Sequence, residues 1–448
     1  MRVGNVPICL AYILAGCSVG TSSTTLLRRQ CPTAELLLSS IQSCIGDAEG
    51  SEIFEQVEGC IQQQRQVEPS QSETQDVWIS QQTGLAYNGT TPACTSHFEH
   101  LNDILCVYAY PEFHNNRGIA IFTTPTLANE FRQRVGIISA QLSTTPQAHL
   151  NALSTDYAVS ALEGRGFGAL ATTDLSTGTL LTTTTPILVV HNAPSTPSFD
   201  RESYLRLAIS LLPPTTQSHF LSLARIYHDP RVTHQDIVKA NAFALDIGGT
   251  SHLALFPEPS RFNHDCAPNA MYRVDSLSLL HEVHIVSGGK VDVGQELTIS
   301  YLDPFLSVRE RHDYLLEAFG FECRCRRCLE GEEDDAAMAE IKRLEGLLGD
   351  WSAASAVQWF EYTDMAERVI ELYERRGLQG FMNTAYGHAA LAYNAVGESG
   401  RATMYARKAL DVARWRHGQR GSRAVEVWEE FLDMGAWKHW SWRRRMPE

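Results

Sequence analysis

Three cysteines within six residues form the part of this sequence whose chemistry is most specific. Cys323, Cys325 and Cys328 cannot all pair with one another, and such a cluster suits a tetrahedral thiolate site for zinc, which needs one more ligand. Of the 11 cysteines, seven lie within the first 106 residues, and Cys266 is the only one outside both groups. We therefore predict one zinc site made by these four cysteines, with a disulfide pair as the alternative.

Cys266 stands in a polar run, Asn263-His264-Asp265-Cys266-Ala267-Pro268-Asn269. Proline inside such a run is unfavourable for a helix or a central strand, so the pattern predicts a loop. The side chains of Asn263 and His264 could hydrogen-bond a polar ligand there. A turn rich in Asn and Asp that binds nothing is the alternative.

Two further segments have weaker patterns when each is taken alone. The glycines in Gly164-Arg165-Gly166-Phe167-Gly168 permit positive φ and let a ligand approach the backbone closely, although a plain turn has the same pattern. Residues 294–304 have the pattern of a strand that ends on the aromatic hydroxyl of Tyr301, for which simple packing is the alternative.

The elements that must position these residues fall into two regions. Residues 155–303 contain short β-rich runs and one mainly helical stretch at 203–242; the runs are 166–171, 179–190, 252–256, 270–274, 282–287 and 296–301. Beyond residue 334, apolar residues at three- and four-residue spacing predict helices at 338–348, 356–376, 384–396 and 401–416. A strand at 118–124 and a helix at 127–135 are expected before the first region.

In their order and spacing, the four segments resemble the SET-domain protein-lysine methyltransferases over about residues 157–330. Three details are similar to the SET-and-MYND branch of that family and its fungal relatives: the run at 263–269, the run Phe319-Gly320-Phe321-Glu322-Cys323-Arg324-Cys325, and Asn241-Ala242-Phe243. The zinc-binding MYND insert is missing, because residues 172–260 contain no cysteine.

The resemblance implies an α+β fold in which a SET domain of small β-sheets with knot-like threading is followed by a post-SET zinc segment and a C-terminal helical lobe. It implies transfer of a methyl group from S-adenosyl-methionine to a protein lysine, with Tyr301 as the active-site tyrosine and Phe243 and Phe319 lining the lysine channel. The residues it implies for cofactor binding are Arg165, Gly166, Phe167, Asn263, His264 and Phe321.

Two other function classes stay open at this point. Phe319 stands where close relatives often carry tyrosine, which removes one hydroxyl near the target amine and favours a catalytically silent SET-fold binding protein. The other class is a secreted, disulfide-stabilised protein with no cofactor. The segment 389–410 resembles one tetratricopeptide-type helix pair that could bind a protein partner, and a plain helical lobe packed on the SET domain is the alternative.

The start of the chain has the pattern of a secretory signal peptide: Arg2, an apolar stretch at 6–19 and small residues before position 21. An uncleaved apolar start, with the protein in the cytoplasm or nucleus, is the alternative. Secretion would make Asn88 a glycosylation acceptor and would allow two disulfides and one spare thiol among five N-terminal cysteines, which otherwise stay unpaired. The expected organisation is signal peptide 1–20, cysteine-containing module 21–150, SET domain 155–303, post-SET segment 304–330 and helical lobe 335–448.

The composition narrows the set of partners. With 52 acidic and 37 basic side chains the formal charge is −15, which argues against direct binding of nucleic acid and is compatible with a basic partner such as a lysine-rich tail. No run after the first twenty residues is long and apolar enough for a transmembrane span.

Overall fold

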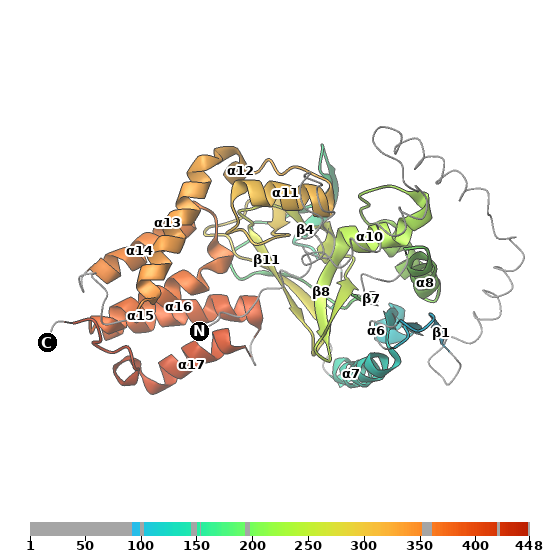
Figure 1. The fold of residues 1–448 in the computed structure, drawn as a ribbon, viewed down its shortest axis with the longest axis horizontal. Coiled ribbons are helices and arrows are strands. Elements are labelled where there is room, and N and C mark those ends of the chain that lie inside the picture. Colours follow the sequence, from blue (N-terminus) through green and yellow to red (C-terminus); the bar gives the residue numbers. More distant parts are fainter. Residues whose placement is uncertain are drawn as a thin grey trace, which may run out of the picture.

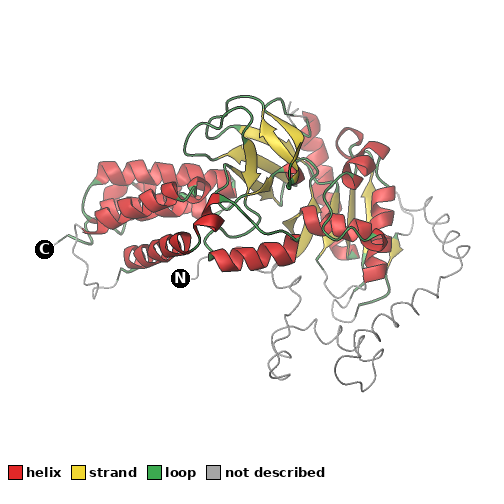
Figure 2. Ribbon diagram, turned by 90° about the horizontal axis from the view of Figure 1, so that it is seen from above, coloured by secondary structure: helices red, strands yellow, loops and turns green. Residues whose placement is uncertain are grey.

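The computed structural model describes residues 92–98, 103–144, 150–152, 154–192, 198–351, 361–418 and 422–446. The signal peptide, Asn88 and the cysteines at 31, 44 and 60 lie outside these residues. The described chain is elongated, with a helical lobe at one end, strands in the middle and further helices at the other end (Figure 1). A second view from above shows the same division (Figure 2).

The largest sheet has six strands in the order β1-β2-β3-β7-β9-β8, antiparallel except for the parallel pair β3–β7. The strands are β1 (Ala93–Cys94), β2 (Cys106–Tyr110), β3 (Ile119–Thr123), β7 (Leu188–His191), β8 (Ala242–Ile247) and β9 (Thr250–Leu255). Side chains alternate between the two faces of β3: Ala120 and Phe122 join one buried cluster, and Ile119 and Ile121 join another. Because both faces are covered, the first four residues of this strand are apolar.

Helices cover both faces of this sheet. They are α6 (Phe113–Asn116), α7 (Pro125–Thr144), α8 (Ser198–Ser210), α9 (Pro214–Leu221) and α10 (Thr233–Asn241). Phe131 of α7 packs with Ile119 and Ile121, whereas Leu205 of α8 and Ile237 of α10 pack on the opposite face. The expected helix at 127–135 is therefore confirmed, and it is longer than expected. The expected helical stretch at 203–242 contains three separate α-helices, α8, α9 and α10.

Two smaller sheets carry the candidate site. One has the order β10-β13-β5-β4 and the other β11-β12-β6. Their strands are β4 (Tyr157–Leu162), β5 (Gly166–Ala171), β6 (Leu180–Thr184), β10 (Asn263–His264), β11 (Ala270–Asp275), β12 (Leu280–Ile285) and β13 (Glu296–Ile299). The β-rich run expected at 179–190 contains two strands, β6 and β7, which belong to different sheets. Pro186, which cannot donate a ladder hydrogen bond, lies in the break.

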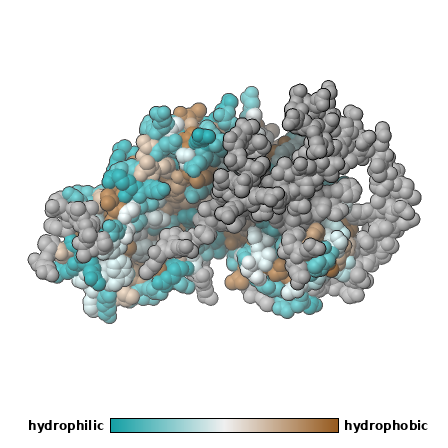
Figure 3. Space-filling view, in the orientation of Figure 1, coloured by the Kyte–Doolittle hydropathy of each residue, from teal (hydrophilic) through white to brown (hydrophobic). Residues whose placement is uncertain are grey.

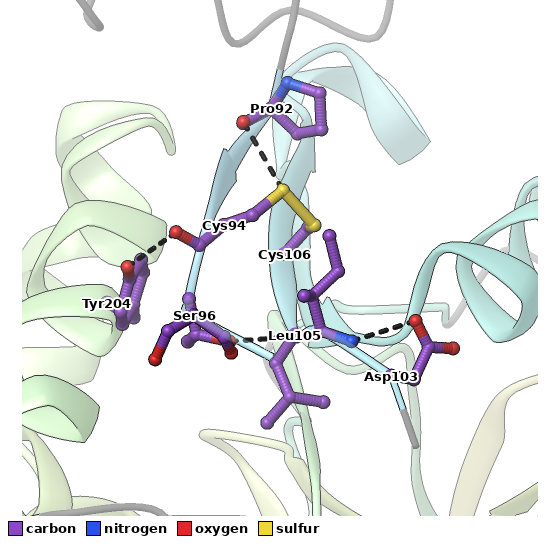
Figure 4. Close-up of a disulfide and its surroundings, with 9 residues drawn as sticks. Pro92, Cys94, Ser96, Asp103, Leu105, Cys106 and Tyr204 are labelled. Carbon is purple, nitrogen blue, oxygen red and sulfur yellow. Dashed lines mark hydrogen bonds between the residues drawn. A yellow bond between two sulfur atoms is a disulfide. The ribbon is translucent and has the colours of Figure 1, made fainter. Parts of the chain in front are cut away.

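A disulfide fastens the edge strand β1 to β2. Cys94 lies opposite Cys106 in the antiparallel register, and their sulfurs are bonded (Figure 4). The Tyr204 hydroxyl of α8 donates to the Cys94 carbonyl at 2.7 Å, so the helix that covers the sheet also holds this edge. The alternative in which the N-terminal cysteines stay unpaired is therefore wrong for these two residues.

After the sheets, two helices lead to the helical lobe: α11 (Val308–Phe319) and α12 (Arg326–Glu330). A capping box starts α11: the Ser307 side chain accepts from the Glu310 N–H, and the Glu310 side chain accepts from the Ser307 N–H. Gly320 ends the helix at φ 73°, a left-handed conformation that favours glycine. This stop directs the chain from Phe319 straight into the cysteine-rich segment.

The helical lobe comprises α13 (Glu332–Gly349), α14 (Glu361–Arg375), α15 (Asn383–Ala395), α16 (Ser399–His417) and α17 (Arg423–Met434). Its helices bury a shared core that includes Ile341, Val369 and Ala389. Hydrophilic side chains cover most of the lobe on the face drawn in Figure 3, with hydrophobic ones scattered between them. Among the described helices, none combines the length and hydrophobicity needed to cross a membrane. The expected fold class is confirmed, with small sheets followed by a C-terminal helical lobe.

Two buried histidines predict acid sensitivity of the fold. Burial lowers the pKa of His281 to about 3 and that of His252 to about 4. Below about pH 6.5 the unfolded chain protonates both rings while the folded chain does not, so the free energy of unfolding should fall as pH drops from about 6.5 towards 4. Each ring should contribute a slope of up to about 1.4 kcal/mol per pH unit. Denaturant unfolding at a series of pH values measures this slope.

His281→Phe should flatten the slope, because it removes one titrating ring from a site already lined by aromatic side chains. His219→Gln, at an exposed position of α9, is the matched control and should leave the slope as it is. An identical slope in wild type and His281→Phe would contradict the assignment.

Candidate functional site

A β-hairpin presents the glycine-rich segment. Strands β4 and β5 pair with Leu162 opposite Gly166, so the intervening residues make the turn. Gly164 and Gly166 have φ of 68° and 67°, which residues with a Cβ rarely adopt. A Cβ on Gly168 would lie 2.8 Å from the Asn263 amide nitrogen, so glycine there lets the polar loop approach the hairpin.

A carboxylate fastens the polar loop to this hairpin. The Asn263 amide donates to Glu296 Oε1 at 2.9 Å and to the Arg165 carbonyl at 3.3 Å. The Arg165 Nε lies 3.1 Å from Glu296 Oε2, and its Nη2 donates to the His264 carbonyl at 3.1 Å. Glu296 was missed as a site residue in the sequence, although a carboxylate at the start of an otherwise apolar strand was a signal for it.

Parallel pairing of β10 with β13 brings the loop beside the end of the strand that carries Tyr301, with His264 opposite Ile299. The Tyr301 N–H donates to His264 Nδ1 at 3.0 Å, so the ring proton belongs on Nε2, which lies 3.3 Å from Cys266 Sγ. Burial lowers the pKa of His264 to about 3, which keeps the ring neutral. His264, which is predicted to bind the cofactor, therefore donates its ring N–H towards Cys266 of the predicted metal site.

Tyr301 is held in a fixed protonation state. Its hydroxyl donates to the Phe262 carbonyl at 2.8 Å, and burial raises its pKa above the usual range. The ring lies with its centroid 4.9 Å from that of Phe319 and 5.4 Å from that of His264. The phenol is neutral and donates its proton to the Phe262 carbonyl. The lone pairs of its oxygen can therefore accept a hydrogen bond from a positively charged group.

The two phenylalanines expected to line a lysine channel come from different elements. Phe319 ends α11 and contacts Tyr301, whereas Phe243 of β8 lies 5.0 Å from Tyr272 and 4.4 Å from His281 between ring centroids. Phe243 and Tyr301 pack against the same buried cluster. The structure thus brings both phenylalanines to the core around Tyr301.

Two large aromatic rings near the polar loop are exposed. Phe167 of the hairpin is 58% exposed and Phe321 is 37% exposed. The ring centroid of Phe321 lies 6.2 Å from that of His264 and 6.4 Å from that of Phe319. Apolar faces left in water beside hydrogen-bonding groups are typical of a site for a ligand with both flat and polar parts.

Four cysteines meet beside this region. The sulfurs of Cys266, Cys323, Cys325 and Cys328 all lie within 4.8 Å of one another, and every one of these residues is buried. Cys266 Sγ lies 4.0 Å from Cys323 Sγ and 3.6 Å from Cys328 Sγ. Metal–sulfur distances of about 2.3 Å in a tetrahedral zinc site place sulfurs roughly 3.8 Å apart, so the cluster fits that ion. All four are free cysteines, so the disulfide alternative is wrong here.

The electrostatics of the cluster also suit a cation. Hydrogen bonding with its neighbours, Cys266 first, lowers the pKa of the Cys325 thiol and takes that of Cys328 to about 6. The same network, through Cys323 first, raises the pKa of the Cys266 thiol, and the pKa of Cys323 is raised as well, although its hydrogen bond with Cys266 acts to lower it. Thiolates are the form of cysteine that coordinates a metal. The arrangement can therefore hold a divalent ion and fix the polar loop, through Cys266, against the segment that follows α11.

Comparisons with known proteins agree with this geometry. A family model described as SET domain matches residues 166–302. The N-lysine methyltransferase SMYD2 of Gallus gallus is 32% identical over 140 residues, which are 31% of this chain and 30% of that protein. The proteins of that name from Homo sapiens and Mus musculus are 31% and 33% identical over 140 residues, again 30% of each relative. The chain thus matches less than a third of the length of these relatives.

The matched range begins at the first residue of β5 and ends just after Tyr301, so it includes the hairpin strand, the polar loop and the strand-end tyrosine. Residues 166–302 match the SET domain, and over a stretch of 140 residues the chain is similar to N-lysine methyltransferases.

Proposed function

We propose that this chain transfers a methyl group from S-adenosyl-methionine to the side chain of a lysine in another protein. The observation that carries the proposal is the convergence of Arg165, Asn263, His264 and Tyr301, which come from three distant segments and are joined by direct hydrogen bonds. The SET domain and its relatives support it, as does the acidic chain, which suits a basic substrate such as a lysine-rich tail.

The donor group would supply a methyl already activated on a sulfonium. Arg165, Gly166 and Phe167 on the hairpin, with Asn263 and His264 in the loop, would hold its polar parts, and the exposed ring of Phe321 would stack on its adenine. The residues fit such a ligand, because Phe167 and Phe321 offer open aromatic faces next to the Asn263 amide and backbone groups.

The target amine must arrive neutral to act as a nucleophile. Phe243 and Phe319 would line its channel, where loss of water lowers the pKa of an ammonium group and favours the neutral amine. Tyr301 has its proton committed to the Phe262 carbonyl, so it would orient the amine through its oxygen and would not accept the amine's proton. Alignment of the amine with the methyl is then the main contribution of the chain.

Zinc is the metal we propose for Cys266, Cys323, Cys325 and Cys328. Support comes from the mutual spacing of the four buried sulfurs, since thiolates are preferred ligands of structural zinc. Four thiolates complete a tetrahedral shell, so the ion would be structural and would not bind substrate.

Replacing Asn263 by alanine should weaken binding of S-adenosyl-methionine by about 1–3 kcal/mol, the usual cost of a lost partner in a buried polar site. Asn263 also joins Glu296 to the hairpin, so the variant loosens the wall of the site as well. Calorimetry measures the affinity. Asn129→Ala, at an exposed position of α7, is the matched control, and equal affinity in the two variants would show that the loop is only a turn.

The function itself is tested by incubating the purified protein with methyl-labelled S-adenosyl-methionine and a protein lysate. Labelled protein that resists base treatment and contains methyl-lysine after hydrolysis is the expected result. Binding of the cofactor with no label transferred to any protein would reject the enzyme.

A catalytically silent SET-fold binding protein is the second candidate, favoured by the missing hydroxyl at Phe319. In that case the site would bind the cofactor, and the helical lobe, with its tetratricopeptide-like pair α15 and α16, would contact a protein partner. Phe319→Tyr separates the two candidates, because restoring a hydroxyl beside Tyr301 alters the rate or the number of methyls only in an active enzyme.

The location of the protein is also a proposal. The Cys94–Cys106 disulfide supports entry into the secretory pathway, because disulfides persist in oxidising compartments. The proposed activity needs S-adenosyl-methionine, and the four-cysteine site needs reduced thiols. Both requirements favour the cytoplasm or nucleus instead.

A further inference from the structure

A cluster of fully buried charges lies between the four-cysteine site and the helical lobe. The side chains of Arg311, Arg327 and Asp334 are all 0% exposed. Asp334 Oδ2 accepts from Arg311 Nη2 at 2.7 Å, and its Oδ1 accepts from Arg327 Nε at 2.8 Å. Arg327 Nη2 reaches Asp334 Oδ2 at 3.0 Å, which makes the pair bidentate.

The cluster joins three parts of the fold. Asp334 lies in the first turn of α13, the first helix of the lobe, whereas Arg311 lies on α11 and Arg327 on α12. Arg327 Nη1 donates to the Cys266 carbonyl at 2.7 Å, and its Nη2 donates to the Pro304 carbonyl at 2.9 Å. One guanidinium therefore contacts the backbone of a predicted metal ligand, the segment just after Tyr301 and the carboxylate of the lobe.

The charges of the cluster do not balance by themselves. Two guanidinium groups face one carboxylate, so one positive charge is in excess in the interior. Burial of an uncompensated charge costs several kcal/mol, so a counter-charge is expected nearby. Arg376 lies 3.8 Å from Asp334 but adds no further unbalanced positive charge, because it also pairs with Glu330 and Glu333.

The four-cysteine site can provide that counter-charge. A divalent ion bound by four thiolates has a net charge of about −2. Arg327 directly precedes Cys328 in the sequence and donates to the Cys266 carbonyl, so its guanidinium lies beside two of the four cysteines. The metal site and the buried arginines are thus close enough to stabilise each other.

We propose that metal binding by the four cysteines and docking of the helical lobe are coupled through Arg327 and Asp334. In this arrangement Arg327 is a positioning residue. It fixes Cys266, and with it the Asn263–His264 loop, at the same time as it fixes the lobe. After loss of the metal the four buried thiolates would take up protons and become neutral thiols, which would remove the counter-charge, release α13 from α11 and α12, and loosen the loop. The coupling depends on a bound metal and does not depend on methyl transfer.

Hydrogen–deuterium exchange of the full chain tests the coupling in its metal-loaded form and after removal of the metal by a chelator. Protection of α13 and α14 should fall with metal loss, while the inner strands β3 and β7, which lie in a separate core, keep theirs. Unchanged protection of α13 after chelation would overturn the proposal. So would wild-type protein that binds no metal while its lobe stays docked.

Asp334→Asn tests the same link from the side of the lobe. It removes the carboxylate that both arginines share, so metal affinity should weaken by about tenfold, the lower end of the effects seen for groups that support metal ligands. Coupling is reciprocal, so α13 should also lose protection with metal still bound. Glu340→Gln, at a less buried carboxylate of the same helix that pairs with Arg343, is the matched control and should alter neither quantity.

If Asp334→Asn fails to fold, the chelation experiment on the wild-type chain still decides the question. A folded Asp334→Asn protein with both metal affinity and lobe protection equal to those of Glu340→Gln would show that the buried charges only pack the fold. Cofactor affinity, measured by calorimetry on both variants, should drop in Asp334→Asn alone, since Cys266 shares its loop with Asn263 and His264.

Discussion

Cys266→Ser should lose the bound metal and unfold at a markedly lower temperature. Cys266 is the one ligand of the cluster that comes from the polar loop, so its loss leaves Cys323, Cys325 and Cys328 with an incomplete shell. Structural zinc contributes on the order of 10 kcal/mol of binding energy to small folds, and loss of even a third of that, about 3 kcal/mol, exceeds most single substitutions. Metal content per chain and thermal unfolding of the purified protein measure both effects.

The double variant Cys94→Ser/Cys106→Ser is the control for this result. It removes two sulfurs from the edge of the six-stranded sheet, away from the four-cysteine cluster, so metal content should stay at the wild-type value. Stability should fall in both proteins, but only Cys266→Ser should lose metal. A Cys266→Ser protein that retains one metal per chain would show that the fourth ligand is another residue.

The four-cysteine cluster could be predicted from the sequence because thiolate chemistry restricts the choice of ligands. Three cysteines in six residues require a fourth ligand, and Cys266 was the only cysteine outside the N-terminal group that could supply it. The loop was predicted correctly only for residues 265–269 around Pro268, because Asn263–His264 form the short strand β10. Both inferences rest on residue types with few structural options.

The buried charges could not be predicted, because their surroundings in the sequence are those of a solvated surface. Asp334 is one of four consecutive acidic residues at the start of α13, and only this one is fully buried. A first turn rich in acid is normal for any helix, since its dipole favours negative charge there. The approach of α11 and α12 decides which of the four acidic residues contacts Arg311 and Arg327. The local sequence pattern does not contain that information.

The strands also show that local sequence patterns do not reveal long-range contacts. The β-rich run at 179–190 holds two strands of different sheets, a change that residue patterns alone do not reveal, although Pro186 marks its position. Strands β4 and β8 were missed, since β4 is largely exposed and β8 follows α10 without a turn signal. The pairing of β10 with β13, which places His264 beside Tyr301, is a long-range contact that only the folded chain defines.

Tyr301→Phe should lower methyl transfer by about 100-fold, the scale on which removing one preorganised polar group from a transition state acts. The hydroxyl donates to the Phe262 carbonyl, so its oxygen is oriented before any substrate arrives. The variant should keep its affinity for S-adenosyl-methionine, because the groups proposed to hold the cofactor, Asn263 and His264, are unchanged. Transfer of labelled methyl and calorimetry of cofactor binding separate these two effects.

Tyr157→Phe is the matched control for this variant. Tyr157 is also a largely buried tyrosine, and its ring lies 5.2 Å from that of Phe262, but it belongs to β4, where burial raises the pKa of its hydroxyl to about 12. Removing that hydroxyl should cost stability without a comparable loss of transfer. Equal losses in the two variants would mean that Tyr301 only packs the core, whereas a loss confined to Tyr301→Phe would place its oxygen next to the reacting groups.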